Sequence, residues 1–129
     1  MSIASTLKYD SAGLIPAVIQ DGANGQILMV GYMNEQAVDR TLESRCVTFW
    51  SRSRQQFWVK GEKSGNTQRL VSMRIDCDRD CLLLQVEQAG PACHEGYRSC
   101  FFREVDAAGE SEELVAERLQ DPAAMYGKR

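Results

Sequence analysis

The segment VSMRIDCDRDCLLLQV, residues 71–86, predicts two strands on either side of a short acidic stretch. Val71, Met73 and Ile75 alternate with polar residues, which is typical of a strand with one buried face. Residues 81–86 are almost entirely apolar and suit a strand that is buried on both faces. These two runs follow each other with no helix between them, and this arrangement recurs along the chain.

The flanking sequence also predicts strands with short connections. Residues 14–20 and 27–33 are apolar runs around a turn-forming cluster at 21–25, which indicates a hairpin. Residues 47–50, 57–60 and 100–105 are strand-like, whereas 51–56 and 61–67 are polar connections. Asn34 is expected to cap a helix over 35–43, and Ser111 a helix over 111–119 that ends at Asp121-Pro122. Because helices of crossover length are missing between most strands, we predict an α+β fold, an antiparallel-rich β-sheet domain with few short helices.

Length and composition set the broad class of the protein. The 129 residues predict a single domain, 1–129, which is large enough for an apolar core. A formal net charge of -3 argues against a broad nucleic-acid or membrane surface, but allows a local basic pocket for a phosphorylated small molecule. Neither a signal peptide nor a transmembrane run is visible, so we expect a cytoplasmic protein. In a reducing compartment the five cysteines are expected to be core residues or metal ligands, not disulfides.

The acidic stretch between the two central strands is the first candidate metal site. Three carboxylates occur at every second position: Asp76, Asp78 and Asp80. In an extended chain they point to one side and Cys77 points to the other. Hard carboxylate oxygens suit magnesium or calcium, and a soft thiolate suits zinc. A solvated acidic turn is the alternative. A helix-loop-helix calcium site is disfavoured because Cys81 occupies the glycine position and a strand-like run follows.

Residues 91–100, PACHEGYRSC, form the second candidate site. Cys93 and Cys100 bracket His94 in a polar loop that contains glycine, which favours metal ligation over a structural role in the core. Cys46 and Cys81 lie in apolar strand contexts, where a buried structural role is favoured. Cys77, Cys93 and Cys100 together would supply three thiolates, and a zinc site with three protein ligands leaves one position for water. His94 is the natural group to transfer a proton beside such a site.

A basic hairpin forms the third candidate site. Arginine forks, hydroxyls and glycine amides bind phosphate, and tryptophan either stacks on a purine or fills the core. The residues expected to bind a nucleotide here are Trp50, Ser51, Arg52, Ser53, Lys60, Ser64 and Asn66. An ordinary hairpin with a basic tip is the alternative, because the pattern is not specific on its own.

Taken together, the three segments resemble the phosphoribosyl-AMP cyclohydrolase family. The resemblance runs from about Gly13 to Arg103 and includes ILMVGYMNEQA, FWSRSR, WVKGEKSGN, DCDRD, VEQAGPACHEG and RSCFFR. The tail DPAAMYG is similar to the ends of single-function members, so no second catalytic domain is expected. Two positions depart from the family pattern. Asn66 stands where many members have histidine, and Cys81 stands where a residue without a thiol is usual.

The resemblance implies a specific reaction and cofactor set. It implies opening of the adenine ring of N1-(5-phosphoribosyl)-AMP by attack of zinc-activated water at C6, with cleavage of the N1–C6 bond. This is the third step of histidine biosynthesis. It also implies a homodimer in which two subunits share the zinc ligands, with magnesium bound by the three aspartates and catalysis by His94. Two other classes stay open: a zinc-stabilised nucleotide-binding module, and a redox-sensing protein that uses Cys77 and Cys81.

Overall fold

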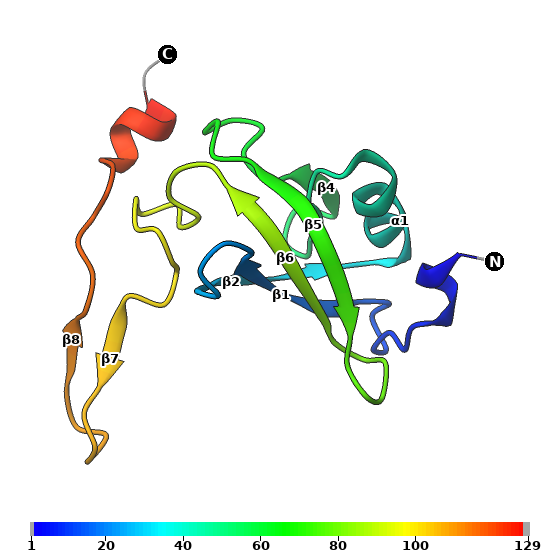
Figure 1. Ribbon diagram of the computed structural model, residues 1–129, viewed down its shortest axis with the longest axis horizontal. Coiled ribbons are helices and arrows are strands. Elements are labelled where there is room, and N and C mark those ends of the chain that lie inside the picture. Colours follow the sequence, from blue (N-terminus) through cyan, green and yellow to red (C-terminus); the bar gives the residue numbers. More distant parts are fainter. Residues whose placement is uncertain (1, 128–129) are drawn as a thin grey trace.

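The computed structural model describes residues 2–127, and its centre is a four-stranded sheet in the order β2-β1-β6-β5 (Figure 1). The strands are β1 (Ile15–Asp21), β2 (Ile27–Met33), β5 (Gln68–Ile75) and β6 (Leu82–Gln88). The β1–β2 and β5–β6 pairs are antiparallel, whereas β1 and β6 pair in parallel at the middle of the sheet. The predicted α+β fold with a mainly antiparallel sheet is therefore confirmed, with one parallel pairing that was not predicted.

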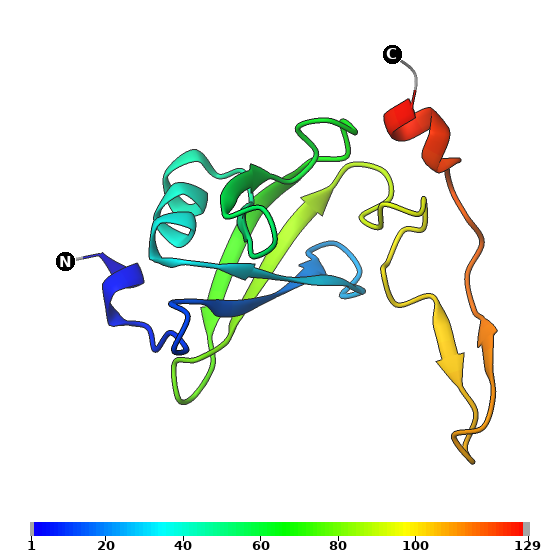
Figure 2. The same cartoon turned by 180° about the vertical axis from the view of Figure 1, so that it is seen from behind.

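Helix α1 (Glu35–Ser44) and the hairpin of β3 (Thr48–Ser51) and β4 (Gln56–Val59) cover one face of this sheet (Figure 2). Asn34 caps α1 as predicted, because its Oδ1 accepts a hydrogen bond from the amide of Ala37 at 2.8 Å. A short 3-10 helix, Ile3–Thr6, precedes the sheet. Among residues 2–127 we find no helix with the length and apolar character needed to cross a membrane.

The core lies between the sheet and this covering layer. Leu82, Leu84 and Val86 of β6 are buried on the covered face, and the ring of Phe49 packs so closely on β2 that a Cβ at Gly31 would overlap it. Leu83 points to the opposite face and is only half-buried. The prediction that this strand is buried on both faces was wrong, because no second layer covers the outer face in the described part of the chain.

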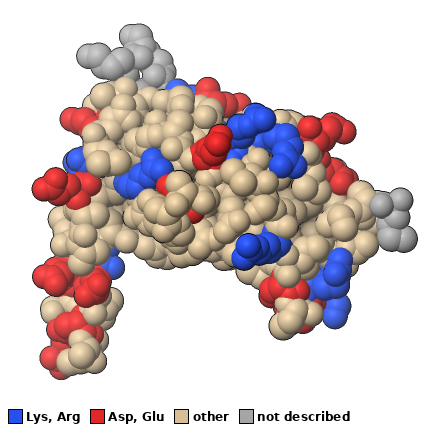
Figure 3. Space-filling model, viewed as in Figure 1, with Lys and Arg blue, Asp and Glu red and all other residues tan. Residues whose placement is uncertain are grey.

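The prediction of a helix over 111–119 was also wrong. Strands β7 (Arg103–Val105) and β8 (Glu112–Leu114) instead form a projecting hairpin whose surface carries many acidic side chains (Figures 1 and 3). Asp106 closes its turn by accepting hydrogen bonds from the Ser111 hydroxyl at 2.6 Å and the Glu110 amide at 2.9 Å. A helix here would have no apolar surface on which to pack, since Leu114 and Leu119 are both 59% exposed.

The predicted end of that helix is in fact the start of another. The C-terminal π-helix Ala123–Gly127 begins directly after Asp121-Pro122. The Asp121 carboxylate accepts a hydrogen bond from the Ala123 amide at 2.9 Å, so this aspartate caps the first turn.

Candidate active site

The loop that follows β6, residues 90–100, folds back on itself and presents the second predicted motif. The Ala92 amide donates to the Arg98 carbonyl at 3.0 Å and the Cys93 amide donates to the Tyr97 carbonyl at 3.1 Å. A tight turn closes with the Gly96 amide donating to the Cys93 carbonyl at 2.9 Å. This backbone pairing fixes the position of Cys93 and leaves His94 of the turn exposed to solvent.

Cys93 and Cys100 are brought together in this loop. Cys93 is 4% exposed and packs with Cys100 against the stacked rings of Tyr97 and Phe102, whose centroids are 3.7 Å apart. Burial raises the pKa of the Cys100 thiol to about 12, and the adjacent Cys93 adds to this through its charge and a hydrogen bond. Two thiolates this close repel each other unless a cation lies between them. The pair therefore fits a soft metal such as zinc.

Lys60 contacts the same loop from the end of β4. Its side chain is buried, and its Nζ donates a 2.6 Å hydrogen bond to the carbonyl of Ala92. Burial lowers the pKa of Lys60, while the nearby thiols of Cys100 and Cys93 act in the opposite direction. The ammonium group is thus hydrogen-bonded to the loop backbone and close enough to the thiol pair to interact with its charge, and one of its three donors is already used.

A pocket of about 320 Å³ opens between His94 of the 90–100 loop and a wall formed by the β3–β4 hairpin and the turn after β4. The predicted residues that line it are Lys60, Ser64 and His94. His94 is exposed and comes from the loop, whereas the facing wall, called here the hairpin wall, consists of the β3–β4 hairpin and of residues 60–64 in the turn that follows β4. Arg54 and Lys63 also line the pocket, although the sequence analysis did not single them out. Their only signal was their place inside the segments FWSRSR and WVKGEKSGN.

Other residues predicted to bind a nucleotide lie outside this pocket. They are Trp50, Ser51, Arg52 and Ser53, around the end of the β3–β4 hairpin. Trp50 packs edge-on against Phe57 with ring centroids 4.9 Å apart, and the Arg52 guanidinium lies 4.1 Å from the centroid of the Tyr32 ring. In this structure Trp50 and Arg52 are therefore partly engaged in contacts within the chain.

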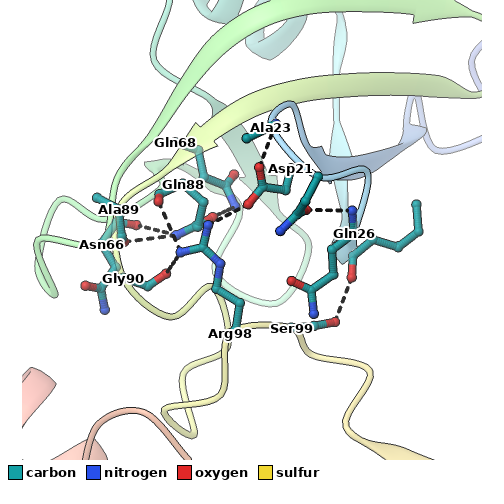
Figure 4. Close-up of polar contacts among 12 residues, drawn as sticks. Asp21, Ala23, Gln26, Asn66, Gln68, Gln88, Ala89, Gly90, Arg98 and Ser99 are labelled. Atoms are coloured by element: carbon teal, nitrogen blue, oxygen red, sulfur yellow. Dashed lines mark hydrogen bonds and ion pairs between the residues drawn. The ribbon is translucent and has the colours of Figure 1, made fainter. Parts of the chain in front are cut away.

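Asn66 is buried at 8% exposure next to the start of the loop (Figure 4). The main-chain carbonyl of Asn66 accepts a hydrogen bond from the Gln88 side chain at 3.5 Å, but the side-chain Nδ2 of Asn66 has no partner among the described residues. A Cβ at Gly90 would lie 2.5 Å from the Asn66 Oδ1, so the side chain packs directly against the loop backbone. Asn66 therefore packs against the loop at Gly90 and is not among the residues that line the pocket.

The three aspartates of the acidic stretch lie together in the turn between β5 and β6. Asp76, Asp78 and Asp80 are exposed and each has an oxygen within 4.8 Å of the others. Asp76 accepts hydrogen bonds from the amides of Asp80 at 3.0 Å and Cys81 at 3.1 Å. A hydrogen bond with Asp78, together with the negative charges of its neighbours, raises the pKa of Asp80 to about 6. Carboxylate oxygens this close together suit a hard divalent cation, and the flanking strands rule out a helix-loop-helix calcium site.

Cys77 does not join Cys93 and Cys100 within one chain. It is exposed on the turn before β6, whereas the other two cysteines follow the far end of that strand (Figure 1). The seven residues of β6 span roughly 20 Å. Of the remaining cysteines, Cys46 is exposed, so its predicted burial was wrong, and Cys81 is half-buried.

Comparison with known proteins agrees with these motifs. The family model described as phosphoribosyl-AMP cyclohydrolase matches residues 29–102, which include the hairpin, the acidic turn and the loop. A phosphoribosyl-AMP cyclohydrolase of Ruegeria pomeroyi is 64% identical over 115 residues, covering 89% of this chain and 96% of the relative. The phosphoribosyl-AMP cyclohydrolase of Paracoccus denitrificans is 57% identical and covers 93% of this chain and 97% of the relative. That of Pelotomaculum thermopropionicum is 52% identical and covers 96% of this chain and 95% of the relative. The chain therefore belongs to the phosphoribosyl-AMP cyclohydrolase family, a family of enzymes, as its motifs predicted.

Proposed function

We propose that the chain hydrolyses N1-(5-phosphoribosyl)-AMP by attack of water at C6 of the purine, with cleavage of the N1–C6 bond, in the third step of histidine biosynthesis. The observation that carries this proposal is the pocket in which His94, next to the buried Cys93, faces the basic side chains of the hairpin wall. A pocket of about 320 Å³ is of the size that small-molecule sites have.

The hairpin wall is suited to bind the anionic parts of the substrate. Arg54 and Lys63 supply cationic donors, and Ser64 supplies a hydroxyl donor. A guanidinium binds phosphate oxygens with two parallel donors, whereas an ammonium acts as a point charge. Trp58 lines the same pocket and offers an aromatic face to a purine ring.

His94 is the group placed to move protons in the ring opening. When water adds to C6, a proton must leave the attacking oxygen, and a proton must reach N1 as the N1–C6 bond breaks. A neutral imidazole can accept the first and donate the second, because its ordinary pKa lies near neutrality. The products of the bond cleavage are a carboxamide carbon at C6 and a formimino nitrogen at N1, so atoms and charge balance with one water consumed.

We further propose two metal cofactors. The ligands for Zn²⁺ would be Cys77, Cys93 and Cys100, and the ligands for Mg²⁺ would be Asp76, Asp78 and Asp80. Zn²⁺, when bound, supplies a Lewis acid that lowers the pKa of water toward neutrality. The thiol pair of the loop and the carboxylate cluster of the turn support this division, because soft and hard donors lie at separate places in the fold.

The zinc ligands are proposed to come from two subunits of a homodimer. Within one chain Cys77 is separated from the loop thiols by the length of β6, so a second copy must supply the missing ligand. An apolar hollow on the outer face of the sheet lies beside the acidic turn, and Val18, Ile75 and Leu83 line it. A second copy that covers this hollow would also lie next to Cys77.

The chemistry is tested by product analysis in water labelled with heavy oxygen. The proposal expects a product one water heavier than the substrate, with the label in the carboxamide oxygen. A substrate that binds but is recovered unchanged would indicate a non-enzymatic binding module. Label in any other position would contradict attack at C6.

A further inference from the structure

An ion pair between the half-buried Arg98 and the buried Asp21 anchors the 90–100 loop from outside the pocket (Figure 4). The Arg98 Nη2 lies 2.6 Å from the Oδ2 of Asp21, which is 3% exposed at the end of β1. The Nη1 of the same guanidinium donates to the carbonyl of Gly90 at 2.9 Å and to that of Gln88 at 3.2 Å. One side chain thus ties the end of β6, the start of the loop and the end of β1 together.

Asp21 is itself held rigidly. Its Oδ1 accepts a hydrogen bond from the Ala23 amide at 2.8 Å, and the next residue, Gly22, donates its amide to the Val86 carbonyl at 2.8 Å. The hydrogen bond from Arg98 is the main cause that lowers the pKa of Asp21, so the carboxylate stays ionised at neutral pH. The loop is therefore anchored to a fixed point of the central sheet.

The backbone carries this anchorage directly to the thiol pair. The Arg98 carbonyl pairs with the amide of Ala92, which precedes Cys93, and Lys60 holds the carbonyl of Ala92 from the opposite side. At the far end of the loop the Cys100 amide donates to the Leu28 carbonyl at 2.7 Å. Cys93 and Cys100 therefore lie on backbone that is fixed at both ends, and Arg98 of the ion pair lies between them in sequence.

We infer that Asp21 and Arg98 are a positioning pair that holds Cys93, Cys100 and His94 in the arrangement that metal binding and catalysis require. Neither side chain lines the pocket or belongs to the proposed ligand set. The inference rests on the proposed function, because the thiol pair is taken as part of a zinc site. Groups that orient metal ligands in this way typically contribute 10- to 100-fold to metal affinity.

The test compares Asp21→Asn with Asp106→Asn. Asparagine at 21 retains the size of the side chain and its acceptor for Ala23, but removes the charge that Arg98 contacts. Asp106 is a matched control, because each carboxylate accepts one side-chain donor and one backbone amide in a turn. The donors to Asp106 are the Ser111 hydroxyl and the Glu110 amide, and they lie in the projecting hairpin. Zinc affinity is measured by competition with a chromophoric chelator, and backbone amide exchange of the loop is measured without metal.

Asp21→Asn is expected to weaken zinc affinity about 10- to 100-fold and to speed exchange of the Cys93 and Gly96 amides, while Asp106→Asn changes neither. Should Asp21→Asn fail to fold, Arg98→Lys replaces it. Lysine keeps the charge but cannot reach Asp21 and both carbonyls at once, so the same weakening is expected. Wild-type affinity and exchange in a folded variant would overturn the inference. A wild-type chain that binds no zinc would instead overturn the proposed function, and the exchange measurement without metal would still test the positioning pair.

Discussion

Replacing His94 with alanine should remove most of the turnover while the fold and the zinc remain. The side chain is exposed, and it makes no hydrogen bond with the described residues, so its loss should change the free energy of unfolding by no more than about 0.5 kcal/mol. It is the only histidine of the chain, so no other imidazole can replace it. A positioned general acid or base contributes roughly a hundred- to ten-thousand-fold to the rate, or about 3–5 kcal/mol of transition-state stabilisation.

Zinc content, melting temperature and kcat measured on one preparation distinguish the possible roles of His94. A catalytic role predicts full zinc, an unchanged melting temperature and a loss of at least a hundredfold in kcat. A fourth zinc ligand predicts loss of metal, and a packing residue predicts a lower melting temperature with a near-normal rate of the folded fraction. Full zinc, unchanged melting and a wild-type rate would refute the reasoning.

Three further predictions follow from the geometry of the site. Cys93→Ser should lose the zinc, about one ion per subunit, whereas Cys46→Ser should keep it; metal analysis that finds full zinc in both variants would reject the thiol assignment. Asp78→Asn should weaken activation by magnesium and leave zinc in place, and a stoichiometric loss of zinc would show that the ligands are divided wrongly. Asp21→Asn should lower the free energy of unfolding at neutral pH by about 1.5–3 kcal/mol, since the ionised carboxylate accepts a charged hydrogen bond from Arg98. Because folding lowers the pKa of Asp21 below 3.8, this difference in urea denaturation should be full above that pH and shrink as the pH falls through the folded pKa; a difference that grows on acidification would contradict it.

The elements predicted correctly are those whose pattern is local. The strand character of β5 and the cap of α1 depend on neighbouring residues, so the sequence alone identifies them. The predicted alternation was wrong at Val71, which is 50% exposed because the register of β5 shifts between Leu70 and Ser72. The pairing of β1 with β6 is not visible in this way, because Ala17 and Leu82 come together from positions about half the chain apart. The helix predicted over 111–119 failed for a related reason. Its apolar spacing was suitable for a helix, but the fold offers no surface on which Leu119 could be buried.

The same distinction applies to the site. The carboxylates of the acidic turn are neighbours in sequence, and they remain neighbours in space. Asp21 and Arg98 are 77 residues apart, and the turn cluster around Asp21 gave no sign beyond turn formation. For Cys77 the local motif gave a prediction that the fold of a single chain does not fulfil. Its motif predicted zinc ligation, yet the strand that follows it carries the chain away from Cys93 and Cys100.

The central claim, that this chain opens the ring of N1-(5-phosphoribosyl)-AMP at a zinc site, is tested most directly by measuring turnover and bound zinc on the same samples. Zinc is removed with a chelator and restored in steps, and the absorbance change on ring opening is followed with magnesium held constant. The account predicts a rate that falls to background without zinc and rises in proportion to bound zinc, up to about one ion per subunit. A full rate in the zinc-free protein, or no turnover in the fully loaded protein, would contradict it.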